Sequence, residues 1–181
     1  MFGTDGAVQL GYGLAAAGGV VRDKEGIWIV GYHRFLGKCS VFDAELWGIL
    51  DGLKIIQRRG HIHVTIQTDS LEVVKSILGS SSTESNSALI RRICNILSQE
   101  NHWILRYIPR EYNQVADCLA RQALMEKPNL QVFDIPPEIT SSFIDRDRHT
   151  DEDANEEQPG LKKLLVIGGV SAIIGIDISP S

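Results

Sequence analysis

The spacing of apolar residues changes from a strand-like pattern to a helical one near residue 43. Residues 1–35 predict three strands: a short one that ends at Asp5, one over 17–22 and one over 27–32. Turn-forming residues separate the last two strands, so these should form a hairpin. Apolar residues then recur at helical spacing from Asp43, a plausible N-cap, and the helix should stop at Gly60.

The following segment alternates strands and helices. A β-branched strand over 61–68 should lead into a short helix opened by Asp69 and Ser70. An amphipathic helix is expected over 88–98, a strand over 103–108, and a last helix capped by Asn113. The order predicts an α/β domain over 1–126. Its five-stranded mixed sheet, antiparallel in the first three strands and then parallel, should be flanked by helices.

The pattern weakens after residue 126. Residues 127–160 predict an acidic, mostly disordered tail, because they hold too few apolar residues for a core. Residues 161–181 are a short apolar segment, in which 164–176 are too few to span a bilayer, which needs about 20. This segment could be an added strand, a partner-binding segment or an artefact of gene prediction. We therefore expect no membrane association.

Composition and charge narrow the function little. The net charge is −5, but residues 1–126 hold 13 basic and 13 acidic side chains, so the acidity lies in the C-terminal part. The body therefore lacks the basic stripe of a strong nucleic-acid binder. Three widely spaced cysteines and no N-terminal signal sequence predict an intracellular protein in a reducing compartment, nuclear or cytoplasmic. We expect a monomer.

Four acidic residues interrupt apolar runs, each at the end of a different predicted element: Asp5, Glu45, Asp69 and Asp117. The strands that end at Asp5 and Asp69 should be neighbours, so that both carboxylates face one site. Each residue also has a simpler explanation, because acidic residues are common as N-caps and in first helical turns. Taken together, they indicate a site for a hard divalent cation, Mg²⁺ or Mn²⁺ rather than zinc.

The order of the short motifs resembles the ribonuclease H type 1 domain in the form found in plant reverse-transcriptase-like proteins derived from non-LTR retrotransposons. The resemblance covers residues 1 to about 125 and is carried by Thr4-Asp5-Gly6-Ala7, Ala17-Gly18-Gly19-Val20-Val21-Arg22-Asp23, Gly26-Ile27-Trp28, Ala44-Glu45-Leu46-Trp47-Gly48, Gly52-Leu53, Thr68-Asp69-Ser70, Pro109-Arg110-Glu111-Tyr112-Asn113 and Val115-Ala116-Asp117-Cys118-Leu119-Ala120.

The resemblance implies an enzyme that hydrolyses the RNA strand of RNA–DNA hybrids. It assigns two Mg²⁺ ions, or Mn²⁺, to the four carboxylates as catalytic and metal-binding residues. Ser70 and Asn113 match positions near the site that contact substrate, and Arg110 could contact its phosphates.

Two features depart from that family. The loop 109–112 has no His, where many active members place one, and only four residues precede Asp5 in a strand that should be central. The alternative is a domesticated, inactive domain that binds nucleic acid or a protein partner.

Overall fold

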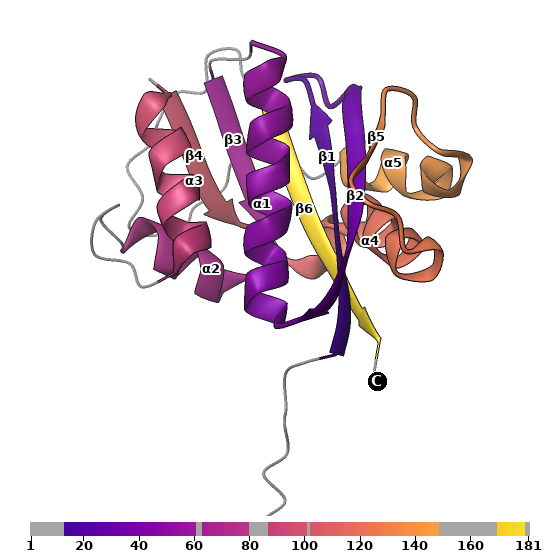
Figure 1. Cartoon of the computed structure of the whole chain (residues 1–181). Coiled ribbons are helices and arrows are strands. Elements are labelled where there is room, and N and C mark those ends of the chain that lie inside the picture. The colour runs from indigo at the N-terminus through magenta and orange to yellow at the C-terminus, as the bar shows by residue number, and fades with distance from the viewer. Residues whose placement is uncertain (1–12, 61–62, 80–86, 101, 149–169, 180–181) are drawn as a thin grey trace, which may run out of the picture.

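A computed structural model describes residues 13–60, 63–79, 87–100, 102–148 and 170–179. They form one six-stranded sheet with helices on both faces (Figure 1). The strands are β1 Gly13–Arg22, β2 Trp28–Cys39, β3 His63–Thr68, β4 His102–Tyr107, β5 Gln131–Phe133 and β6 Val170–Ser179. The helices are α1 Val41–Arg58, α2 Leu71–Leu78, α3 Ala88–Gln99, α4 Gln114–Glu126 and α5 Ser141–Arg148, with short 3-10 turns η1 Arg110–Tyr112 and η2 Glu138–Thr140.

The predicted hairpin is present and longer than expected. β1 and β2 pair antiparallel from Gly13 to Arg22, whereas the sequence pattern placed the start of the first of them at residue 17. The Asp23 carboxylate closes the turn by accepting backbone N–H bonds from Glu25 and Ile27, at 3.0 and 2.8 Å. Gly26 has φ 75°, a conformation that costs other residues more.

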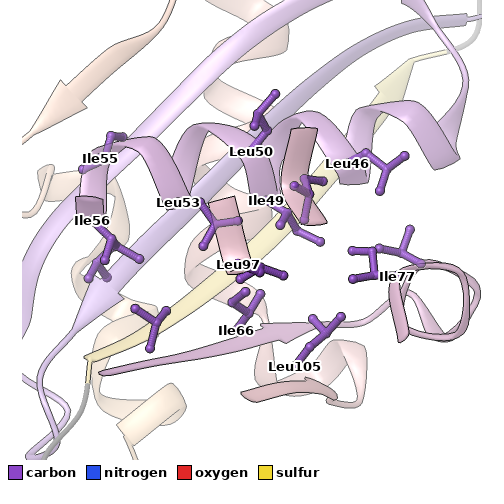
Figure 2. Close-up of a cluster of buried hydrophobic side chains, with 14 of the residues drawn as sticks. Leu46, Ile49, Leu50, Leu53, Ile55, Ile56, Ile66, Ile77, Leu97 and Leu105 are labelled. Carbon is purple, nitrogen blue, oxygen red and sulfur yellow. The ribbon is translucent and has the colours of Figure 1, made fainter. Parts of the chain in front are cut away.

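The main core lies between the sheet and α1, α2 and α3. Figure 2 shows leucine and isoleucine side chains of α1 directed toward Ile66 of β3 and Leu105 of β4. The N-cap of α1 is Ser40, whose hydroxyl accepts the N–H of Asp43 at 3.0 Å. The prediction that Asp43 is the cap was therefore wrong, because a serine three residues earlier already satisfies that donor.

Helix α4 packs closely on the opposite face of β1. A Cβ atom added at Gly18 would lie 2.5 Å from the backbone N of Ala120 and 2.6 Å from the carbonyl O of Ala116. On the other face, Tyr32 donates a hydrogen bond to the Gly48 carbonyl of α1 at 2.8 Å. The glycine thus sets the distance between α4 and the sheet, and the tyrosine ties β2 to α1.

The centre of the sheet differs from the prediction. The strand order is β4-β3-β6-β1-β2-β5, so the apolar segment near the C-terminus supplies a central strand. β6 runs antiparallel to β1 and parallel to β3. The neighbour of β3 on this side is therefore β6, and not the strand predicted to end at Asp5, which lies outside the described residues. Of the readings left open for 161–181, the added strand is the one the fold contains.

Residues 127–148 are also more structured than a disordered tail. They contain β5, which pairs with β2 at Gly31–His33, followed by η2 and α5. The α/β class is confirmed, with β1 and β2 antiparallel and β3 and β4 parallel. Among the helices that the structure describes, none has the length and apolar character needed to cross a membrane.

Candidate active site

The C-terminal end of β3 lies beside the first turn of α1. Thr68, the last residue of β3, is fully buried and donates a hydrogen bond from its hydroxyl to Glu45 Oε2 at 3.0 Å. The same hydroxyl accepts the backbone N–H of Ser70 at 3.2 Å. Thr68 thus fixes the Glu45 carboxylate next to Asp69, the residue between the two ends of this hydrogen-bonded chain.

The third acidic residue comes from the other face of the sheet. Asp117 lies in the first turn of α4 and is 8 % exposed. Its Oδ2 accepts a hydrogen bond from Arg110 Nε at 3.1 Å. Its Oδ1 is buried and has no hydrogen-bond partner among the described residues. One oxygen of this carboxylate is therefore held, and the other is left for a further ligand.

Burial raises the pKa of Glu45 to about 8. The largest cause is the loss of water around the carboxylate, which is 4 % exposed, and the second is the charge of Asp69. The hydrogen bond from Thr68 lowers the pKa, and the charge of Asp117 raises it again. Three acids on three elements, α1, the end of β3 and α4, therefore interact with one another.

The other two acids are also harder to ionise than free aspartates. Burial raises the pKa of Asp117 to about 6, although the charge of Arg110 acts in the opposite direction. Burial likewise raises the pKa of Asp69, against lowering by Arg110 and by a hydrogen bond from Asn113. A bound cation would favour all three ionised forms at once.

The donor chemistry of these residues suits a hard divalent cation. Mg²⁺ prefers oxygen ligands, and the trio offers carboxylate oxygens, including the unpartnered Oδ1 of Asp117. Within the described residues, however, no three His, Cys, Asp or Glu side chains are grouped closely enough to hold a metal ion by themselves. The trio thus fits part of a metal site, and the fourth predicted ligand, Asp5, lies outside the described residues.

The three predicted substrate-binding residues have different surroundings. Ser70 is the N-cap of α2, where its hydroxyl accepts the N–H of Val73 at 3.3 Å, so Asp69 is not the cap. Asn113 is fully buried at the N-cap position of α4, but its side chain makes no capping bond. Arg110 has a side chain that is 68 % exposed beside Asp117. Of the three, only Arg110 can reach a bound polyanion without rearrangement.

Thr68 is the site residue that sequence reasoning missed. It stands in the Thr68-Asp69-Ser70 motif, but a threonine at the end of a β-branched strand has a sufficient explanation in strand propensity. Its bond to Glu45 joins residues of different elements and leaves no local pattern in the sequence.

Comparison with known families agrees with this arrangement. A family model described as reverse transcriptase-like matches residues 3–123, which include all four predicted carboxylates. The chain belongs to the reverse transcriptase-like family.

Other reverse transcriptase-like and ribonuclease H proteins are similar to the chain. A protein of Arabidopsis thaliana with the provisional name ribonuclease H protein is 35% identical over 147 residues, which are 80% of this chain. The aligned part is only 23% of that relative's length.

Solved structures share the fold. RNase H1 from the halophilic archaeon Halobacterium salinarum matches with a TM-score of 0.58 and 25% identity, over 66% of this chain and 92% of that one. LC11-RNase H1, solved in complex with an RNA/DNA hybrid, matches with a TM-score of 0.57 and 22% identity, over 65% and 91% of the two chains. The predicted ribonuclease H-like fold of this reverse transcriptase-like protein is thereby confirmed.

Proposed function

We propose that this protein is a metal-dependent endonuclease that hydrolyses the RNA strand of RNA–DNA hybrids. The observation that carries the proposal is the convergence of Glu45, Asp69 and Asp117, from three separate elements, on one end of the sheet. Membership of the family supports it, as does a fold shared with an RNase H1 that binds an RNA/DNA hybrid. The carboxylates would hold Mg²⁺, or Mn²⁺, together with Asp5.

The metal would supply the chemistry of the reaction when bound. Two divalent ions about 4 Å apart activate a water molecule and stabilise the leaving oxygen of a phosphodiester. The protein's part is to position the ligands. Thr68 orients Glu45, and Arg110 orients Asp117 so that its Oδ1 stays available.

The raised pKa values give the empty site a second property. Near pH 7 and without a cation, Glu45 keeps its proton, because its pKa is about 8. Binding of a divalent cation should release that proton, so the apparent metal affinity should increase with pH up to about 8. Asp117, with a pKa of about 6, contributes over a lower range.

Arg110 is suited to contact the substrate. Its Nε is engaged by Asp117, while most of its side chain is exposed to solvent. The guanidinium has further N–H donors, which match phosphate oxygens in geometry. We assign it to the backbone of the hybrid near the scissile phosphate.

The direct test is cleavage of a labelled RNA–DNA hybrid by the purified full-length chain with Mg²⁺. Asp69→Asn should abolish cleavage, since the neutral amide is a poorer cation ligand. Glu72→Gln is the matched control, because Glu72 lies three residues away on the exposed surface of α2 and should leave the rate unchanged.

Two results would count against the proposal. Hybrid binding without turnover by the folded protein would select the alternative, a domesticated domain that binds nucleic acid without cutting it. Equal loss of activity in Asp69→Asn and Glu72→Gln would show that the carboxylate site does not carry the reaction.

A further inference from the structure

The position between β1 and β3 holds a strand from a distant part of the sequence. β6 pairs with β1 from Leu14↔Ser179 to Arg22↔Ser171, and with β3 from Val64↔Val170 to Thr68↔Ile174. We call this position the central slot. Residues 149–169 separate β6 from α5 in the sequence, so β6 is connected to the rest of the fold by a long segment.

The central slot is the one place in the sheet where another strand could pair with β1. The opposite edge of β1 is occupied by β2 along its whole length, Gly13 to Arg22. The sequence predicts a strand ending at Asp5, close before β1. A strand that reaches β1 through a tight connection runs antiparallel to it, as β6 does. The two segments would therefore enter the same slot in the same direction.

The register shows what β6 brings to the carboxylates. Thr68 is opposite Ile174, so the next position along β6, level with Asp69, is Gly175. The only acidic residue of β6, Asp177, is opposite Ala16 and lies two positions beyond that level. With β6 in the central slot, the backbone position level with Asp69 thus carries no carboxylate. This agrees with the finding that no three metal-binding side chains are grouped within the described residues.

We propose that the central slot is a strand-exchange site and that β6 holds the protein in an inhibited form. In the active form, the N-terminal segment that carries Asp5 replaces β6. This rests on the proposed function, since it supplies the missing carboxylate for the same reaction. Backbone hydrogen bonds lost by β6 are replaced by those of the incoming strand, so the free-energy difference depends on strand length and side-chain packing. β6 has ten residues, whereas few precede Asp5, which favours the inhibited form.

A reversible crosslink tests the inhibition. Leu14→Cys and Ser179→Cys place two thiols at opposed positions near the ends of β1 and β6. The native cysteines are replaced by alanine, because Cys39 lies opposite Gly13 and could form the wrong disulfide. The oxidised protein, with β6 locked, should cleave the hybrid at least about tenfold more slowly than the reduced one, because the rate follows the competent fraction. Equal rates in both forms would overturn the proposal. Either single-cysteine variant is the matched control, and oxidation should not change its rate.

Hydrogen exchange tests the strand replacement without any activity. Ile174→Pro removes a backbone donor from the middle of β6 and should release it. Amide protection should then decrease in 170–179 and increase in 1–12, with a cooperative thermal transition retained. Loss of that transition, or release of β6 without new protection at 1–12, would refute the exchange. If protection moves as expected but no form of the protein cuts the hybrid, the exchange stands and the proposed nuclease function fails.

Discussion

The substitution Thr68→Val tests how the site holds Glu45 in place. Valine has nearly the shape of threonine, so β3 and its packing should persist, while the hydroxyl is lost. Two hydrogen bonds disappear with it: the one donated to Glu45 at 3.0 Å and the one accepted from the Ser70 N–H at 3.2 Å. Both partners lie in the buried or half-buried interior of the site.

The magnitude follows from burial and from the charge of Glu45. A buried hydrogen bond contributes about 1 kcal/mol net, and about 1.5–3 kcal/mol when one partner is charged. Because the bond from Thr68 lowers the pKa of Glu45, its loss should raise that pKa above about 8. Each tenfold change in the acid constant corresponds to about 1.4 kcal/mol. The loss in free energy of unfolding should therefore be larger at pH 9, where wild-type Glu45 is ionised, than at pH 5, where it is protonated.

The assay is urea denaturation of the metal-free protein at pH 5 and pH 9. We expect Thr68→Val to cost about 1 kcal/mol at pH 5 and about 2–3 kcal/mol at pH 9. In a Glu45→Gln background, the difference between the two pH values should vanish. Thr65→Val is the matched control, a half-exposed threonine on the same strand, and should show little dependence on pH. An equal cost of Thr68→Val at both pH values would refute the role assigned to the hydroxyl.

Three further predictions concern charge and packing. Without metal, stability should fall as pH rises from about 4.5 to about 8, because folded Glu45 keeps a proton that the unfolded chain loses; urea midpoints across this range should show the fall, and Glu45→Gln should flatten it. Arg110→Ala should raise the pKa of Asp117, whereas Arg110→Lys should largely preserve it, as followed by carboxyl NMR titration; an unchanged pKa in Arg110→Ala would contradict the pairing. Gly18→Ala should cost about 1–3 kcal/mol in thermal or urea unfolding, since its Cβ would meet the α4 backbone, and a neutral effect would mean that α4 can move away freely.

Local patterns in the sequence were sufficient for most of the elements. The hairpin at Asp23–Gly26 and the helices α1 to α4 depend on turn chemistry and apolar periodicity, both of which act over a few residues. The ends were less certain, as the cap of α1 shows, because Ser40 and Asp43 are both good capping residues and only the backbone geometry separates them.

The rest of the fold and site depends on pairing between distant residues. An apolar run such as 170–179 contains nothing that names its partners, and its position between β1 and β3 follows from hydrogen bonds to two other strands. The same limit applied to Thr68, whose partner Glu45 belongs to another element. In contrast, Glu45 and Asp117 could be proposed because charged residues within apolar runs are costly and require an explanation.

The central position of β6 also has a consequence for biosynthesis. Without this strand, the sheet divides into two separate parts, β3 with β4 and β1 with β2 and β5. Residues 170–179 leave the ribosome after all the other described elements, so the two parts must wait, with unpaired strand edges facing each other, until translation has passed them. Such edges are templates for association with other chains. The nascent protein should therefore depend on chaperones late in synthesis, and its slowest folding step should be the insertion of its last strand into the middle of the sheet.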